Sequence, residues 1–255
     1  DLVHASRGCR FNCFPCCTPF LGGRNFRPRP IDTVIAEMEK IENNRLFIVD
    51  NSLAQDDQWE KDLFRAMAPL KKKWVSHPIK DDDEILDLAV KAGAWYVYQA
   101  IVDTSDYMRK RIRRLKERGI GVEGTILLGL DEHDEDYIKR MVDFLLDVDL
   151  DLAEFTILTP FPHTPIRAKL EAEGRILHNE WSRYTCGSCV YQPKRMTPEK
   201  MEEMYRYAWD TFYSSCSKEI QMAKLYVNVI KREKADGTYQ RYDLRNKTRW
   251  GADTR

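Results

Sequence analysis

Three cysteines near the start of the chain have a spacing that can hold a metal centre. Cys9, Cys13 and Cys16 follow a C-x-x-x-C-x-x-C pattern, and a fourth cysteine, Cys17, is adjacent to the last of them. Thiolates separated by three and two residues let one loop wrap around a cubane [4Fe-4S] cluster. Three ligands leave one iron open, and an open iron can bind a substrate or a cofactor.

Structural zinc is the alternative interpretation of this loop, with Cys17 or His4 completing a tetrahedral site. Zinc sites usually repeat a close pair of cysteines at a distance, and this loop does not, so we favour the cluster. The chain has seven cysteines, an odd number, and four of them lie within nine residues, where disulfide geometry is seldom reached. The cysteine count therefore predicts a metal centre in a reducing compartment.

A second group of cysteines lies towards the C-terminus, where Cys186 and Cys189 in "TCGSCV" have redox or metal spacing. With Cys216 they could form an auxiliary cluster or a zinc site. A closed zinc site needs four donors, so we favour unligated thiols. Among the five histidines, His77 and His163 fall at the ends of predicted strands, where each could contact a substrate or simply be hydrogen bonded.

The elements that must position these residues alternate between strand and helix, which is the pattern of βα units on a parallel sheet. A first strand in "LVHAS" is followed by apolar runs at 45–50, 73–77, 94–101, 122–130 and 152–158. These runs are so continuously apolar that we expect helices on both faces of the sheet. Six such strands predict an α/β fold, a partial (β/α)6 TIM-like barrel, over residues 1–165. Function in such folds lies at the carboxyl ends of the strands, where the cysteine loop follows the first strand.

Residues 166–255 lack this alternation of strands and helices. They are predicted to form a mainly helical C-terminal accessory region with a polar tail. One helix begins after the N-cap Thr197, with Pro198 in its first turn. An apolar stripe over 201–212 predicts that this helix packs on the barrel. From Lys231 the residues are polar, and we expect them to be loosely held.

The composition is typical of a soluble, cytoplasmic protein. The 41 basic residues balance the 41 acidic ones, so the net charge does not favour binding to nucleic acid or to an anionic membrane. The basic run at 109–119 has Ile112 and Leu115 on one side and is interpreted as a solvated helix face. No apolar run approaches the roughly 20 residues of a transmembrane segment, and no signal peptide is recognisable. The chain lacks an initiator Met, so we expect a fragment of a longer protein.

The cysteine loop resembles the signature of the radical S-adenosylmethionine (SAM) superfamily. The resemblance extends through "SRGCRFNC", "FIVDNS", "GIGVEGTILLGLDEHDED" and "LAEFTILTPFPHTPI", and it covers about residues 3–215. These motifs look like the subgroup whose members usually carry an N-terminal cobalamin-binding domain. The chain is therefore expected to be the catalytic domain of such an enzyme.

The resemblance implies a role for each cysteine of the loop. Cys9, Cys13 and Cys16 would ligate the [4Fe-4S] cluster, and Cys17 would be a bystander. The open iron would chelate the amino and carboxylate groups of SAM. No residue is assigned a catalytic role beyond cofactor binding.

The resemblance also implies SAM contacts at the ends of three strands. Asp50 and Asn51 would accept hydrogen bonds from the SAM ammonium, although these residue types could equally start a turn. Small residues on the fifth strand would let the backbone approach the adenine, or would mark a bulge. The expected residues of the fifth and sixth strands are Gly124, Ile126, Gly129, Leu158, Thr159 and Pro160.

Two features depart from the family pattern. The position before the last cluster cysteine is usually aromatic, whereas here it is Pro15, with Phe14 one place earlier. The Gly-Ile-Glu-Ser-like stretch after the fourth strand is replaced by "QAIVDTSDYM", in which Asp103 could take the place of the missing glutamate. Both departures favour a second hypothesis, a zinc-stabilised or degenerate binding module without radical chemistry.

The function implied by the resemblance is reductive cleavage of SAM. The resulting 5′-deoxyadenosyl radical would abstract hydrogen from an unactivated carbon of a small-molecule or lipid-like substrate. Cobalamin-dependent methylation is the leading outcome, with cobalamin bound by an upstream domain that is not in this chain. A non-methylating rearrangement or ring formation is the next possibility. A flavodoxin or ferredoxin would serve as electron donor.

Overall fold

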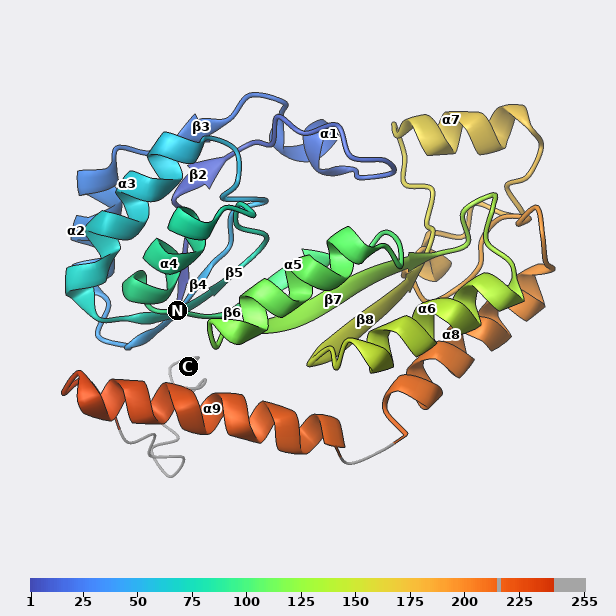
Figure 1. Cartoon of the computed structure of the whole chain (residues 1–255). Coiled ribbons are helices and arrows are strands. Elements are labelled where there is room, and N and C mark those ends of the chain that lie inside the picture. The colour runs from blue at the N-terminus through green and yellow to red at the C-terminus, as the bar shows by residue number, and fades with distance from the viewer. Residues whose placement is uncertain (215–216, 241–255) are drawn as a thin grey trace, which may run out of the picture.

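Six parallel strands form one sheet, as the sequence predicts (Figure 1). The computed structural model describes residues 1–214 and 217–240, so Cys216 and the end of the predicted polar tail lie outside the described residues. Five of the strands match the predicted apolar runs to within two residues at either end. The strands, in their order in the sheet, are β1 (Leu2–Val3), β4 (Arg45–Ile48), β5 (Lys73–Ser76), β6 (Ala94–Ala100), β7 (Gly121–Leu128) and β8 (Leu152–Ile157).

Helices connect consecutive strands, and most of them begin at a side-chain cap. Asp56, Asp82, Ser105, Asp134 and Thr197 each accept a hydrogen bond from a backbone N–H in the first helical turn. The helices are α1 (Thr18–Gly22), α2 (Ile31–Lys40), α3 (Asp57–Met67), α4 (Asp83–Ala92), α5 (Asp106–Glu117), α6 (Glu135–Asp147), α7 (Pro165–Ala172), α8 (Pro198–Phe212) and α9 (Ser217–Ala235), with 3-10 turns at Ala68–Leu70 and Trp181–Arg183.

The two faces of the sheet differ, which departs from our expectation of helices on both. Along β7 the residues alternate between buried positions such as Ile126 and half-buried positions such as Glu123 and Thr125. Each strand is the sheet neighbour of the next, and right-handed crossovers then place every connecting helix on the same side. The sheet is accordingly that of a partial TIM-like barrel, with one face against the helices and the other face less buried.

The accessory region covers the β8 edge of the sheet. Helix α8 packs on α6 and β8, as its apolar stripe predicts. The Tyr213 hydroxyl accepts a hydrogen bond from Ala153 N (3.0 Å) and donates one to Ala153 O (2.8 Å). At the other end of the strand, Ile157 N donates to Cys186 O at 2.6 Å. These contacts satisfy backbone groups that an edge strand otherwise leaves unpaired.

Helix α9 runs below the amino ends of the strands (Figure 1). Its Glu233 is 1% exposed and forms a two-point ion pair with Arg45 at the start of β4. Lys218 Nζ donates to Leu150 O (2.7 Å), just before β8. The helix continues past Lys231 to Ala235, so the first part of the predicted loose tail is instead held against the sheet.

None of the helices in the described ranges, 1–214 and 217–240, has the length and apolar character required to cross a membrane.

Candidate cofactor site

A two-stranded antiparallel ribbon closes the base of the cysteine loop. It pairs β2 (Ser6–Arg7) with β3 (Arg27–Pro28). The predicted first strand in "LVHAS" thus divides into β1 and the start of β2, and β3 was not predicted. Inside the ribbon, Cys9 N donates to Gly23 O at 3.1 Å. Backbone hydrogen bonds therefore hold together the two ends of the cysteine loop.

Two polar side chains at the end of β4 hold this loop against the sheet. Asp50 accepts hydrogen bonds from Ala5 N (2.8 Å) and Ser6 Oγ (2.5 Å), in the segment that leads into the loop. Gln55, which is fully buried, donates to Gly8 O at 3.1 Å and accepts from Arg10 N at 2.9 Å. Buried polar groups with several partners fix geometry, so the loop has a defined place at the carboxyl end of β4.

The three predicted ligands lie within electrostatic reach of one another. Cys9 is buried, whereas Cys13 and Cys16 are exposed, and Cys16 N donates to Cys13 O at 2.9 Å. Burial raises the pKa of Cys13, and the neighbouring thiols of Cys16 and Cys9 raise this pKa further. Three cysteines on one anchored loop are a donor set that fits an iron–sulfur cluster.

Cys17 is half-buried, whereas Cys9 is buried and Cys13 and Cys16 are exposed. Burial raises the pKa of Cys17, followed by the thiol of Cys16 and, more weakly, that of Cys186 in the accessory region. No group of three or more histidine, cysteine or carboxylate side chains is arranged for a single metal ion in the part of the chain that the structure describes. The ligand roles of the loop cysteines remain predictions.

The residues expected to bind the SAM ammonium have different surroundings. Asp50 is 1% exposed, and both of its oxygens already accept hydrogen bonds from the segment before the loop. Its evident role is to position that segment. Asn51 is exposed, and a Cβ added to Gly22 would lie 3.7 Å from its Nδ2, so the carboxamide lies near α1, directly after the cysteines. Asn51 is thus the more accessible of the two predicted contacts.

The predicted glycines of β7 have packing partners in the structure. A Cβ at Gly124 would approach Leu150 and Ile101 to within 3 Å. Gly129 has a φ of +92°, which favours glycine, and the Tyr191 hydroxyl donates to its carbonyl. Close packing therefore accounts for both glycines, and adenine binding by either remains a prediction.

The other predicted SAM contacts lie in or beside the core. Ile126 is 1% exposed and belongs to the hydrophobic core on the helix side of β7. Leu158, Thr159 and Pro160 follow β8 and are buried, and Thr159 Oγ1 donates to Ile157 O at 3.0 Å. These residues form the carboxyl end of β8 without presenting an open surface.

The second cysteine group is split between two environments. Cys189 is 2% exposed, its thiol donates to Tyr191 O, and burial raises its pKa to about 12. A thiol of this kind stays protonated at neutral pH, which agrees with our preference for an unligated residue. Cys186 is half-buried, and its thiol is one of the groups that raise the pKa of Cys17 in the cysteine loop.

Gln55 was not predicted, although its side chain makes two hydrogen bonds with the cysteine loop. Its partners are 45 and 47 residues away in the chain. Its position a few residues after a strand that ends in Asp50 was the available signal, because polar residues at that edge meet the neighbouring loops.

The sequence has relatives among known proteins. No family model matches the sequence. The chain is 26% identical over 226 residues to a bacteriochlorophyllide d C-12(1)-methyltransferase of Chlorobaculum tepidum, covering 80% of this chain and 49% of the relative. It is 24% identical over 237 residues to an anaerobic magnesium-protoporphyrin IX monomethyl ester cyclase of Cereibacter sphaeroides, covering 83% of this chain and 38% of the relative.

A solved structure shares the fold. It is that of a radical S-adenosylmethionine methyltransferase, TsrM, from Kitasatospora setae, with cobalamin and a [4Fe-4S] cluster bound. The TM-score is 0.63 at 19% identity, over 80% of this chain and 46% of the other. The chain spans half or less of the length of each of these three proteins.

Proposed function

We propose that the chain is a radical S-adenosylmethionine enzyme, and that Cys9, Cys13 and Cys16 hold a [4Fe-4S] cluster that also binds SAM. The cluster, when bound, supplies the one-electron reduction of SAM on which this class of chemistry depends. The observation that carries the proposal is the anchored loop: the Gln55 side chain bonds to Gly8 and Arg10 on either side of Cys9, and Cys13 and Cys16 follow in the same loop.

The protein's own residues contribute placement. Asp50 and Gln55 hold both the entry to the loop and its first residues, so the cysteines can bind without first ordering the chain. Asn51 is the residue best placed to accept a hydrogen bond from the SAM ammonium, because its carboxamide is exposed beside α1.

The reaction that we favour is cobalamin-dependent methylation, with a flavodoxin or ferredoxin as reductant in the cytoplasm. Support comes from the methyltransferase relative and from the likeness to an enzyme solved with cobalamin. Cobalamin would be held by a part of the protein outside these 255 residues. Ring formation is the second candidate, and it is supported by the likeness to a cyclase at similar coverage of this chain.

Anaerobic reconstitution with ferrous iron and sulfide tests the proposal. We expect about four irons per chain, with broad visible absorbance, and release of 5′-deoxyadenosine after addition of SAM and dithionite. Cys9→Ala, Cys13→Ala and Cys16→Ala should each abolish cluster binding. Cys17→Ala is the matched control and should retain it.

Three outcomes would contradict parts of the proposal. One zinc per chain and no nucleoside release would favour the binding module. A requirement for Cys17 together with a dispensable Cys16 would show that the ligand assignment is wrong. Formation of 5′-deoxyadenosine without S-adenosylhomocysteine, in the presence of cobalamin and substrate, would favour ring formation over methylation.

A further inference from the structure

A cleft of about 390 Å³ lies at the amino ends of the strands, between the end of α9 and the end of α4. It is lined by the 3-10 turn that follows α3, by the start of β5, and by the last turns of α4 and α9. This volume is in the range of small-molecule sites. Helix α9 and helix α1, which follows the cysteine loop, lie at opposite ends of the sheet, so the cleft is remote from the proposed cofactor site (Figure 1).

Backbone contacts hold one wall of this cleft in place. Gly93, which ends α4, has a φ of +107°, and a Cβ at this position would clash with Lys72 O. Glycine therefore lets the end of α4 pack directly on the segment that leads into β5. Trp74 N donates to Gly93 O at 3.2 Å, so this wall is joined to the sheet itself.

Positive charge dominates the cleft, which we call the basic cleft. Of the described residues that line it, four are basic and one, Asp236, is acidic. The Lys73 side chain is 2% exposed, and its Nζ donates to Asp236 Oδ2 at 2.7 Å, so these two charges balance. The other three basic residues give the excess of positive charge. They are Lys71, Lys91 and Arg232.

These three cations have no carboxylate partner among the residues that the structure describes. Arg232 is half-buried, and its guanidinium donates to two backbone carbonyls, at the end of α4 (2.9 Å) and at the start of β6 (2.8 Å). Lys71 Nζ donates to Asp236 O at 3.4 Å, and Lys91 is exposed in the last turn of α4. A guanidinium has five N–H donors and an ammonium has three, so each cation retains donors for a ligand.

The charge excess of the basic cleft is local, because the 41 basic residues of the chain are balanced by 41 acidic ones. In the basic run at 109–119, by contrast, Arg109, Arg114 and Arg118 each pair with a carboxylate of a neighbouring element. The sequence that follows the cleft does not supply the counter-charge, since residues 241–255 include more basic than acidic residues. The cleft thus combines concavity with uncompensated positive charge, which are the two requirements of a site for a small anion.

We propose that the basic cleft binds a small anion that carries two linked phosphate groups. The Arg232 guanidinium would present paired N–H donors to one phosphate, while Lys71 and Lys91 act as point charges on the other. One phosphate monoester carries about two negative charges at neutral pH, so a diphosphate group balances the excess better than a single carboxylate does. No aromatic side chain is among the described residues of the lining, so the phosphates are the recognised part and not a stacked base.

Titration calorimetry with inorganic pyrophosphate tests the proposal on the iron-reconstituted chain. The buffer lacks free metal ions and holds the ionic strength constant, and sulfate serves as the comparison anion. We expect one pyrophosphate per chain, bound at least tenfold more tightly than sulfate, about the effect of one added charge-assisted contact. Equal binding of the two anions would overturn the proposal, because it would show only the screening of surface charge.

Variants of the lining locate the binding. Lys71→Gln and Lys91→Gln should each weaken pyrophosphate binding about fivefold, because each removes one charge at an exposed position. Lys40→Gln, equally exposed in the last turn of α2, is the matched control and should leave the affinity unchanged. Asp236→Asn removes the carboxylate of the cleft and should tighten binding, which a loss of structure would not do. Unchanged affinity in both variants of the cleft lysines, with an unchanged circular dichroism spectrum, would contradict the proposal.

Two further measurements separate this site from other sources of anion binding. Cys13→Ala should lose iron and keep its affinity for pyrophosphate, so the proposal is tested independently of the proposed function. Loss of pyrophosphate binding in Cys13→Ala would show that the anion binds at the iron, and would overturn the proposal. Cosedimentation with phosphatidylglycerol vesicles, without any binding of pyrophosphate, would overturn it in favour of a membrane-facing surface.

Discussion

Gln55 accepts a hydrogen bond from the backbone N–H of Arg10 at 2.9 Å, across 45 residues of sequence. The same carboxamide donates to Gly8 O and Ser52 O, so one buried side chain joins the cysteine loop to the turn after β4. The position of the thiols relative to the sheet is therefore set by a residue that is not itself expected to bind any cofactor.

Replacement of Gln55 by Ala should loosen the cysteine loop. Three backbone groups lose their partner, and the loss of stability should be about 1–3 kcal/mol, because unpaired buried polar groups are costly. Reconstituted protein should contain less iron per chain, as measured by colorimetric iron analysis. Gln58→Ala is the control, since Gln58 is exposed on α3 and its carboxamide donates to Asp62. Equal iron content in the two variants would contradict a role for Gln55 in the site.

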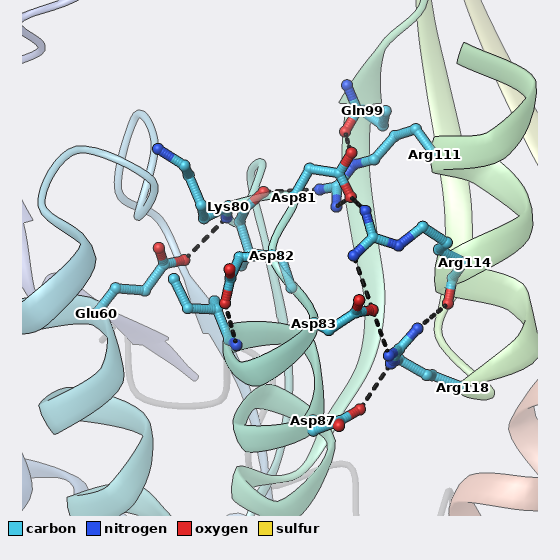
Figure 2. A network of polar contacts seen from close by, with 12 residues as sticks. Glu60, Lys80, Asp81, Asp82, Asp83, Asp87, Gln99, Arg111, Arg114 and Arg118 are labelled. Atoms are coloured by element: carbon cyan, nitrogen blue, oxygen red, sulfur yellow. Dashed lines mark hydrogen bonds and ion pairs between the residues drawn. The ribbon is translucent and has the colours of Figure 1, made fainter. Parts of the chain in front are cut away.

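Arg111 should be the most sensitive cation of the basic run at 109–119. It is 3% exposed and donates to Gln99, Asp81 and Ile79 O, so it joins α5 to β6 and to the loop before α4 (Figure 2). Arg111→Met should cost about 3–5 kcal/mol in urea unfolding, the usual effect of breaking a buried network.

Arg113→Met, at an exposed position of the same helix, is the control and should change stability by less than about 0.5 kcal/mol. Similar effects of the two substitutions would show that the network contributes little. The expectation of a fully solvated basic face is thus only partly right, because Arg114 and Arg118 also pair with acidic residues of the α4 region (Figure 2).

Glu60 should make stability fall as pH rises. Burial raises its pKa from 4.5 to about 7, with Lys80 N as a hydrogen-bond donor at 3.2 Å (Figure 2). The folded chain therefore binds this proton more tightly than the unfolded chain, and the free energy of unfolding decreases between about pH 4.5 and about pH 7. The full effect is on the order of 3 kcal/mol.

Urea unfolding of Glu60→Gln across this pH range measures the effect. The substitution should become progressively more stabilising relative to the native chain as pH rises, because Gln carries no charge to bury. Glu39→Gln, exposed on α2, is the matched control. A pH-independent difference for Glu60→Gln would show that the carboxylate is not disfavoured.

Glu233→Ala should release α9 from the sheet. The substitution removes the acceptor of three hydrogen bonds from Asn44 and Arg45. Limited proteolysis should then cleave within α9 at a concentration of protease that leaves the native chain intact, because local opening controls cleavage. Glu219→Ala, exposed in the first turn of α9, should resist cleavage like the native chain. Identical cleavage of both variants would contradict this role.

The strands and the main helices could be predicted because their signals are local. Apolar runs gave the strands at 45–48 and 121–128, and the cap at Thr197 gave the start of α8. The placement of the cysteine loop at the carboxyl end of β1 followed from the order of elements alone.

The contacts that hold the cysteine loop in place could not be predicted, because each joins residues that are distant in the sequence. Asp50 accepts a hydrogen bond from Ser6, and Gln55 donates one to Gly8. Both bonds require the strands to be paired first. The ribbon of β2 and β3 is two residues long on each side, too short for an alternation signal. The resemblance assigned Gly124 and Gly129 to adenine binding, but a small residue serves close packing as well as ligand approach.

The sheet ends at β1 on one side and at β8 on the other, and these two strands are not paired with each other. A closed ring of strands has a circumference fixed by its hydrogen-bond ladder. This sheet can open or tighten by small changes of twist at each strand pair while every ladder bond is kept. Ligands of different widths can therefore bind beside the same cysteine loop without any loss of secondary structure.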